Sequence, residues 1–268
     1  MKRKEELKIK YRIGVIKEEL VKFRDSKGKE LWGILSLPAK EKNIPLLIIC
    51  HGFNQTKSQR KFVKLARFSA QNEIAAFRFD FSGHGDSTGE LEKISIGKQV
   101  EELKAAYGVL IRNKRINKKR IAVLGHSLGA LITVLFQTKY EKAKTLILLS
   151  PALQQRELTR EWHTAEEIKL WEKQGYLDTP KGRIGIQYFK EAMEKDWSDI
   201  ASRIKIPTLV IHGSEDDDVP IKYSREVMRK LGGKKKLEVV KAADHHFESY
   251  QAKNKFVALS LVWLKKYL

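Results

Sequence analysis

Apolar and polar residues alternate along this chain in blocks that predict strands and helices in turn. Eight short runs rich in apolar and β-branched residues predict strands, at 15–23, 31–37, 46–50, 74–80, 120–124, 145–149, 208–212 and 236–240. Between the later runs, apolar residues recur every three or four positions, which predicts helices, at 59–71, 96–112, 128–140, 221–231 and 249–267. This order indicates an α/β fold, an about eight-stranded, mostly parallel sheet flanked by helices, with an antiparallel amino-terminal edge.

One long segment, residues 151–205, interrupts the alternation between the sixth and seventh predicted strands. Its pattern predicts helices, and it is rich in large aromatic residues. An insertion at the carboxyl end of a strand lies over the sheet edge where ligands bind. We therefore expect a helical cap within a single domain formed by residues 1–268. Most of its aromatic residues should pack the cap onto the body, and three are candidates for substrate contact: Trp162, Trp171 and Tyr176.

The pentapeptide Gly125-His126-Ser127-Leu128-Gly129 joins a predicted strand directly to a predicted helix. A serine on so sharp a turn has a strained backbone, and glycines two positions before and after it provide the necessary space. The turn would expose the Ser127 hydroxyl and leave the Leu128 N–H free to bind an oxyanion. The pattern is short enough to arise by chance, but its place between strand and helix indicates a nucleophilic serine. His126 is a candidate substrate contact.

A serine nucleophile needs a base and an acid that orients the base. In sheets of this type the acid and then the histidine follow the serine along the chain. After the seventh predicted strand, residues 215–218 are four consecutive acids, and we choose Asp216, with the two aspartates after it as alternatives. The run could also be only a solvated cluster at a helix N-terminus. After the eighth strand, His245 and His246 are adjacent, and because both cannot face the serine we choose His245 as the base.

The loop after the third predicted strand is the expected source of a second oxyanion donor. Gly52 allows the backbone to turn close to a ligand, and the N–H of Phe53 would pair with that of Leu128. Each such donor contributes about 3 kcal/mol at the transition state. The Phe53 side chain is also a candidate substrate contact. We expect His51 to brace this loop rather than act as a base, and Cys50 to be a buried strand residue.

The chain is strongly basic, with 53 Lys and Arg against 33 Asp and Glu and a formal net charge of +20. This charge fits an anionic partner such as a nucleic acid, an acidic lipid surface or a CoA thioester. It also fits the heavily charged surfaces of heat-adapted proteins. The basic residues are dispersed, with local clusters at 57–64, 112–120 and 229–236, and no zinc-finger, homeodomain or RNP pattern accompanies them. We therefore favour the charged thermophilic-type surface and expect no specific nucleic-acid partner.

The basic amino terminus is not followed by the apolar stretch of a secretory signal. The apolar runs are too short to span a bilayer, and the single cysteine cannot form an internal disulfide. We therefore expect a cytoplasmic protein without a membrane span.

On these motifs the chain resembles the α/β-hydrolase family of serine esterases. Within that family it is most similar to cinnamoyl and feruloyl esterases and to their relatives among monoacylglycerol lipases and serine aminopeptidase-like hydrolases. The run of four acids departs from the usual pattern of the family. The residues that carry the resemblance are His51-Gly52-Phe53, residues 78–87, the Ser127 pentapeptide, His212-Gly213 with Asp216 and Val219-Pro220, and Ala243-Asp244-His245 with Phe247.

The resemblance implies an α/β-hydrolase fold with Ser127, Asp216 and His245 as catalytic triad and a cap that in feruloyl esterases holds the aromatic acid. We expect a serine carboxylesterase that forms an acyl-enzyme with small to medium acyl or aromatic, feruloyl-like esters and uses no cofactor or metal. An acyl thioesterase or monoacylglycerol lipase with the same triad is the alternative, and a non-catalytic binding scaffold is a third reading. The expected partner is a small-molecule ester, and a homodimer is left open.

Overall fold

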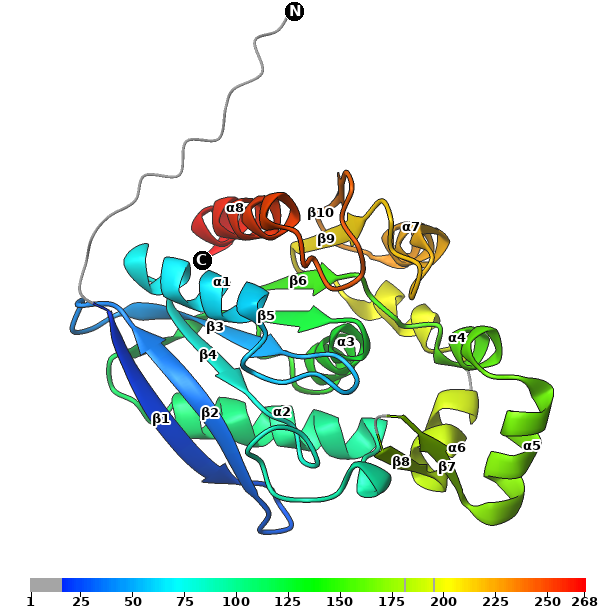
Figure 1. Cartoon of the computed structure of the whole chain (residues 1–268). Helices are drawn as coiled ribbons and strands as arrows, with labels where there is room; N and C mark the ends of the chain where they lie inside the picture. The colour runs from blue at the N-terminus through cyan, green and yellow to red at the C-terminus, as the bar shows by residue number, and fades with distance from the viewer. Residues whose placement is uncertain (1–15, 181, 195) are drawn as a thin grey trace, which may run out of the picture.

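The computed structural model describes residues 16–180, 182–194 and 196–268. An eight-stranded sheet with the order β1-β2-β4-β3-β5-β6-β9-β10 forms its centre (Figure 1). β2 pairs antiparallel with β1 and β4, and all other neighbours are parallel. The strands are β1 (Lys17–Arg24), β2 (Glu30–Leu37), β3 (Ile44–Cys50), β4 (Ala75–Phe79), β5 (Ile116–His126), β6 (Thr145–Leu149), β9 (Thr208–Gly213) and β10 (Lys235–Val240). The expected fold class is confirmed.

Helices cover both faces of this sheet. Figure 1 shows α1 (Arg60–Gln71) and α8 (Tyr250–Tyr267) on one side, and α2 (Ile96–Leu110) and α3 (Leu128–Tyr140) on the other. A further helix, α7 (Ile221–Lys230), packs on β9 and β10. Central strands are buried on both faces and so consist of continuous apolar residues rather than an alternation.

Strand β3 illustrates this packing. Leu46 and Ile48 point into the apolar layer under α2 and α3, whereas Leu47 and Ile49 point into the layer under α1 and α8. Cys50, the only cysteine of the chain, ends this strand and is fully buried. Burial raises the pKa of its thiol to about 12, so the thiol stays protonated at neutral pH, as expected for a packing residue.

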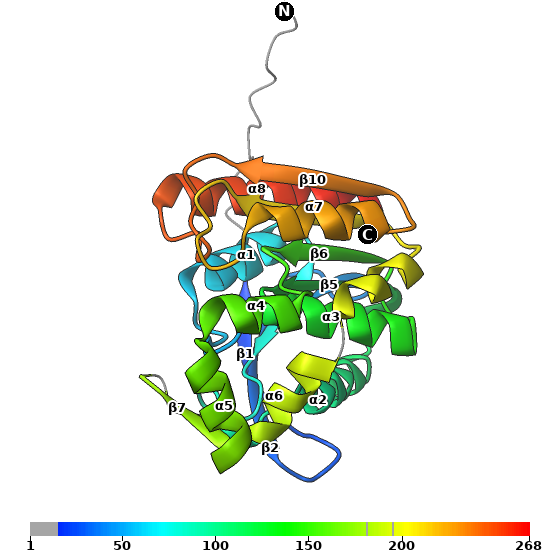
Figure 2. The ribbon, with the colours of Figure 1, turned by 90° about the vertical axis from the view of Figure 1, so that its right-hand side faces the viewer.

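The insertion between β6 and β9, residues 151–205, is called the cap below. It lies at the edge toward which the parallel strands point, and Figure 2 shows its helices gathered there. The prediction of helices alone is wrong here, because β7 and β8 form an antiparallel hairpin. β8 packs on the short helix η1 (Leu91–Lys93) of the body. The cap elements are α4 (Gln155–Trp162), α5 (Ala165–Gln174), β7 (Tyr176–Thr179), β8 (Gly182–Gly185), α6 (Ile186–Glu194) and η2 (Trp197–Arg203).

Within the described ranges, no helix combines the length and the apolar character that crossing a bilayer requires.

Candidate active site

Ser127 stands on a strained turn between the end of β5 and the start of α3. Its φ of 54° and ψ of −121° lie in a region that non-glycine residues rarely adopt, and such strain is typical of functional sites. Two close approaches explain the flanking glycines. A Cβ at Gly125 would lie 2.2 Å from the Gly129 carbonyl oxygen, and a Cβ at Gly129 would lie 2.4 Å from the His51 carbonyl oxygen. The turn therefore forms only with glycine at both positions.

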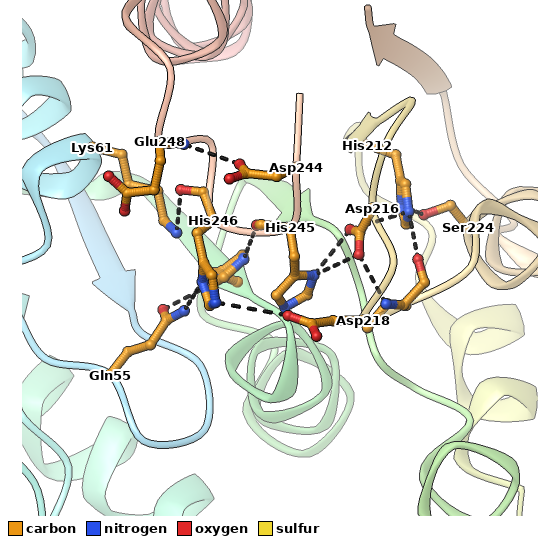
Figure 3. Close-up of polar contacts among 12 residues, drawn as sticks. Gln55, Lys61, His212, Asp216, Asp218, Ser224, Asp244, His245, His246 and Glu248 are labelled. Carbon is orange, nitrogen blue, oxygen red and sulfur yellow. Dashed lines mark hydrogen bonds and ion pairs between the residues drawn. The ribbon is translucent and has the colours of Figure 1, made fainter. Parts of the chain in front are cut away.

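Asp216 and His245 meet on the neighbouring loops after β9 and β10. His245 Nδ1 lies 3.0 Å from Oδ1 and 2.9 Å from Oδ2 of Asp216 (Figure 3). The two side chains are 7% and 1% exposed. Burial raises the pKa of the Asp216 carboxyl, but the contact with His245 outweighs it and leaves this pKa below its ordinary value. Asp216 is therefore ionised at neutral pH and holds the Nδ1–H form of the ring.

The alternative acids lie elsewhere. Asp217 is exposed, and the carboxylate of Asp218, 58% exposed, lies 3.7 Å from His246 Nε2. Neither contacts His245 in the described chain, so Asp216 is the acid with the geometry to orient that ring.

His126 connects the serine turn to the loop of His245. Its Nε2 donates to the His245 carbonyl oxygen at 2.9 Å, and the two rings lie 4.7 Å apart between centroids. Among the described residues the His245 side chain hydrogen-bonds only to Asp216, and no hydrogen bond joins it to Ser127 Oγ. Such contacts commonly form only when substrate binds. His126 itself is fully buried, so the structure places it behind the site rather than open to substrate.

The loop after β3, residues 51–59, carries the predicted oxyanion donor and is called the oxyanion loop below. It passes directly beside Ser127. A Cβ at Gly52 would lie 3.0 Å from Ser127 Cβ, so any larger residue here would have to displace the serine turn by a few tenths of an ångström. In the described part of the chain, neither the Phe53 N–H nor the Leu128 N–H donates to an acceptor, and both remain available for an oxyanion. His51 braces the loop, since its Nδ1 donates to the Gly52 carbonyl oxygen at 2.8 Å and its Nε2 accepts from the Phe81 N–H at 3.0 Å.

Gln55 links three parts of the site, a role that the sequence analysis did not predict. Its side-chain amide lies 2.8 Å from His126 Nδ1 and 2.9 Å from His246 Nδ1, and its oxygen accepts from the Gly52 N–H at 3.3 Å. The oxyanion loop, the serine turn and the histidine loop therefore share one amide group. His246 has no place beside Asp216 and acts through this network.

Lys61 also supports the loop that carries His245 and His246, a role that the sequence analysis did not predict. It is 1% exposed, and its Nζ donates to the His246 carbonyl oxygen at 2.9 Å (Figure 3). Burial lowers the pKa of this lysine to about 7. Together with the bond from His126, two consecutive carbonyls of the histidine loop are each held by a buried donor.

His212 fixes the acid loop in a similar way. Its Nδ1 accepts from the Ser224 hydroxyl at 2.7 Å, and its Nε2 donates to the Val219 carbonyl oxygen at 2.8 Å. The same Nε2 lies 3.3 Å from Asp216 Oδ2. Burial lowers the pKa of His212, so the ring is neutral and donates only from Nε2. The loop that carries Asp216 is thereby fastened to α7.

The cap meets the oxyanion loop through one aromatic pair. The Tyr188 ring on α6 lies 5.6 Å from the Phe53 ring between centroids. Tyr188 is 6% exposed, and its hydroxyl donates to Gln155 Oε1 at 2.7 Å. This cap residue was not among the expected substrate contacts, because nothing in the sequence distinguishes it from the other cap aromatics.

The three expected cap contacts occupy different surroundings. Trp162 is exposed and its Nε1 donates to the Asp218 carbonyl oxygen at 2.9 Å, next to the acid loop. Trp171 is 1% exposed and packs 4.9 Å from the Phe189 ring inside the cap. Tyr176 lies on β7, where the Arg183 guanidinium covers its ring. Their contact with substrate stays a prediction.

The sheet order, the serine turn and the neighbouring acid and histidine loops define an α/β-hydrolase. The chain has the α/β-hydrolase fold. More particularly, residues 41–173 match the family model described as serine aminopeptidase, S33.

Two curated relatives and one solved structure illustrate the likeness. Esterase EstD of Thermotoga maritima is 24% identical over 233 residues, covering 78% of this chain and 55% of that protein. The mitochondrial palmitoyl-protein thioesterase ABHD10 of Mus musculus is 24% identical over 201 residues, covering 70% and 64%. Each match thus spans less than two thirds of the relative. Est1E from Butyrivibrio proteoclasticus, solved with bound ferulic acid, superposes with a TM-score of 0.79 at 24% identity, covering 91% of this chain and 99% of that one.

Proposed function

We propose that this protein is a serine carboxylesterase with Ser127 as nucleophile, His245 as general base and Asp216 as the orienting acid. The observation that carries the proposal is the buried Asp216–His245 pair, with His245 Nδ1 2.9 Å from Asp216 Oδ2, on loops tied to the strained serine turn. The relatives named as esterase and thioesterase support the same reaction class.

The reaction begins when Ser127 Oγ attacks the ester carbonyl carbon. His245 Nε2 takes the serine proton, and Asp216 stabilises the imidazolium. The N–H groups of Phe53 and Leu128 hold the negative oxygen of the tetrahedral intermediate. Its collapse breaks the bond to the alcohol, which leaves with the proton from His245. In the second step His245 takes a proton from water as the water attacks the acyl-enzyme carbonyl carbon. The bond to Ser127 Oγ then breaks, the carboxylic acid is released, and His245 returns the proton to Ser127.

We propose small to medium acyl or aromatic esters, of the feruloyl and cinnamoyl kind, as substrates. The Tyr188 and Phe53 rings lie together where the cap meets the oxyanion loop, and an aromatic acyl group packs favourably against such rings. Est1E, which has the same fold, binds ferulic acid. Rates for acetyl, butyryl, octanoyl and feruloyl esters would rank these substrates, and a uniform preference for octanoyl would contradict the aromatic assignment.

Ser127→Ala tests the nucleophile. We expect the variant to fold normally and to lose hydrolysis by several orders of magnitude, and a fluorophosphonate probe should label the native protein but not the variant. Ser260→Ala, which removes a buried hydroxyl on α8, is the control and should keep its labelling. Esterase activity retained by Ser127→Ala would refute the assignment.

Thioester hydrolysis by the same triad is the second candidate, and the relative ABHD10, named a palmitoyl-protein thioesterase, favours it. Parallel assays with p-nitrophenyl esters and acyl thioesters of equal chain length separate the two. A higher kcat/KM for the thioester would replace the first proposal.

A further inference from the structure

One edge of the sheet carries a row of exposed lysines. Five neighbouring parallel strands, β3, β5, β6, β9 and β10, begin at this edge. Each has an exposed lysine in its first residues or in the loop just before it. We call these five the lysine row: Lys42, Lys118, Lys144, Lys205 and Lys234. With strands about 4.8 Å apart, the row extends about 19 Å.

The lysine row is not neutralised by its neighbours. None of its five lysines forms an ion pair with a residue that the structure describes, and Lys205 Nζ donates instead to the Ser202 carbonyl oxygen at 2.9 Å. Helix α8 ends at the same edge with Lys265 and Lys266, which are both exposed. The loops that enter the five strands and β4 contain only three acids: Glu41, Glu73 and Glu141.

Acids gather at the opposite edge of the sheet, beside the candidate active site. The loop after β9 contains residues 215–218, all acidic, and the loop after β10 adds Asp244 and Glu248. The excess positive charge therefore does not surround the entrance to the catalytic residues. Capture of an anionic substrate by the active site does not account for it, and the lysine row is a separate surface.

We propose that the lysine row binds the phosphodiester backbone of a nucleic acid without reading its bases. A duplex carries one negative charge per about 1.7 Å of axis when both strands are counted, so a stretch as long as the row, about 19 Å, contains about eleven phosphates. A bilayer fits less well, because surfaces that dock on membranes usually insert apolar side chains. Among the residues that the structure describes, the exposed large hydrophobic ones lie outside the loops of this edge: Leu20, Trp162, Leu170, Val239, Tyr250 and Val262.

The test measures fluorescence anisotropy of a labelled DNA duplex of about 20 base pairs at about 50 and 200 mM NaCl. Five lysine–phosphate contacts predict that the affinity of the native protein falls about 500-fold between these concentrations. The variant K42E/K118E/K144E/K234E should bind at least 100-fold more weakly at the lower salt. Lys205 is left unchanged because of its bond to Ser202.

The matched control is K27E/K29E/K169E/K173E. These four lysines are exposed and lie away from the row, in the β1–β2 turn and on α5, and the control changes the net charge by the same amount. It should lose less than tenfold in affinity. Equal losses in the two variants, no binding by the native protein at low salt, or binding only to vesicles that contain phosphatidylserine would each overturn the proposal.

Two further measurements keep folding and hydrolysis separate from this result. Circular dichroism and the thermal midpoint verify that both variants fold. Ester hydrolysis by the row variant should equal that of the native protein, because the row lies at the edge opposite the catalytic loops. If the native protein hydrolyses no ester, the proposed function fails while the duplex-binding result still stands or falls by itself.

Discussion

His245 is positioned through its backbone as well as its ring. Its own carbonyl oxygen accepts from His126 and the next one accepts from Lys61, while Asp216 holds Nδ1. Three separate elements thus bind two consecutive peptide units and one ring. If His245 is the base, as proposed, its ring is oriented before substrate arrives, which reduces the reorganisation needed at the transition state.

Asp216→Asn should lower kcat about 10⁴-fold, because an amide donor at this position favours the wrong tautomer of His245. Steady-state kinetics with a neutral ester measures this. Asp217→Asn changes an exposed neighbour and should remain close to native. A similar loss of kcat in both variants would show that Asp216 is not the acid that orients His245.

Lys61→Met should stabilise the protein at low pH. Burial lowers the pKa of Lys61 to about 7 from the ordinary 10.5. Between these values the unfolded chain binds a proton that the folded protein does not, so this lysine makes stability fall as pH decreases toward 7, and its full cost is present below that pH. Urea unfolding at about pH 6 and pH 10 measures this effect. We expect Lys61→Met to raise the unfolding free energy by at least about 1 kcal/mol more at pH 6 than at pH 10.

Lys190→Met, at an exposed position on α6, provides the control and should change stability little at either pH. A gain from Lys61→Met that does not depend on pH would show that the buried charge has no energetic cost. The bond from Lys61 to the His246 carbonyl predicts a further effect, a lower kcat with little change in KM.

The three catalytic candidates could be chosen from sequence because each follows a strand that the apolar pattern marks. Position alone did not distinguish Asp216 from its neighbours, and burial against His245 does. Gln55 could not be found, since a lone glutamine in a loop has no pattern. Lys61 did leave a signal, because its spacing from Leu65 and Ser69 places a lysine on the buried stripe of α1.

At the scale of elements, the five predicted helices and the strands of the large sheet could be predicted from periodicity, and the cap only in part. Its hairpin strands have four residues each, too short for an alternating pattern to emerge. Packing of β8 on η1 stabilises them, and that contact joins segments about ninety residues apart. Local sequence does not encode such a contact.

Tyr188 connects the cap to the loop of the proposed oxyanion donor through its contact with the Phe53 ring. Tyr188→Ala should lower kcat/KM for a small ester about two- to thirteenfold, because an aromatic pair contributes about 0.5–1.5 kcal/mol and Phe53 supplies a proposed oxyanion donor. Tyr188→Phe retains the ring contact and loses only the bond to Gln155, so it should stay within about twofold. An equal loss of kcat/KM in both variants would show that the Tyr188 hydroxyl, and not its ring, supports activity.

For the whole molecule, charge is distributed by edge. Acids lie in the loops of the proposed catalytic residues, and the lysine row lies at the opposite edge. Composition revealed the total of +20 but not this separation, which arises because the fold brings loops distant in sequence to the same edge. The dispersed basic residues of the sequence become one row only when five strands lie side by side.

A net charge of +20 also opposes the compact state through self-repulsion, which salt screens. The thermal midpoint should therefore rise by several degrees between about 20 and 500 mM NaCl. K42E/K118E/K144E/K234E lowers the net charge by eight units, so its thermal midpoint should rise less over the same range of salt. A midpoint that falls with added salt would indicate that attractive surface pairs outweigh the repulsion.

The buried thiol of Cys50 provides an internal reporter. It ends a strand that lies between two others and is covered by helices on both faces, so a sulfhydryl reagent reaches it only when β3 separates from its neighbours. Since the chain has no second cysteine, the labelling rate in native buffer would measure how often the middle of the protein opens, without any engineered label.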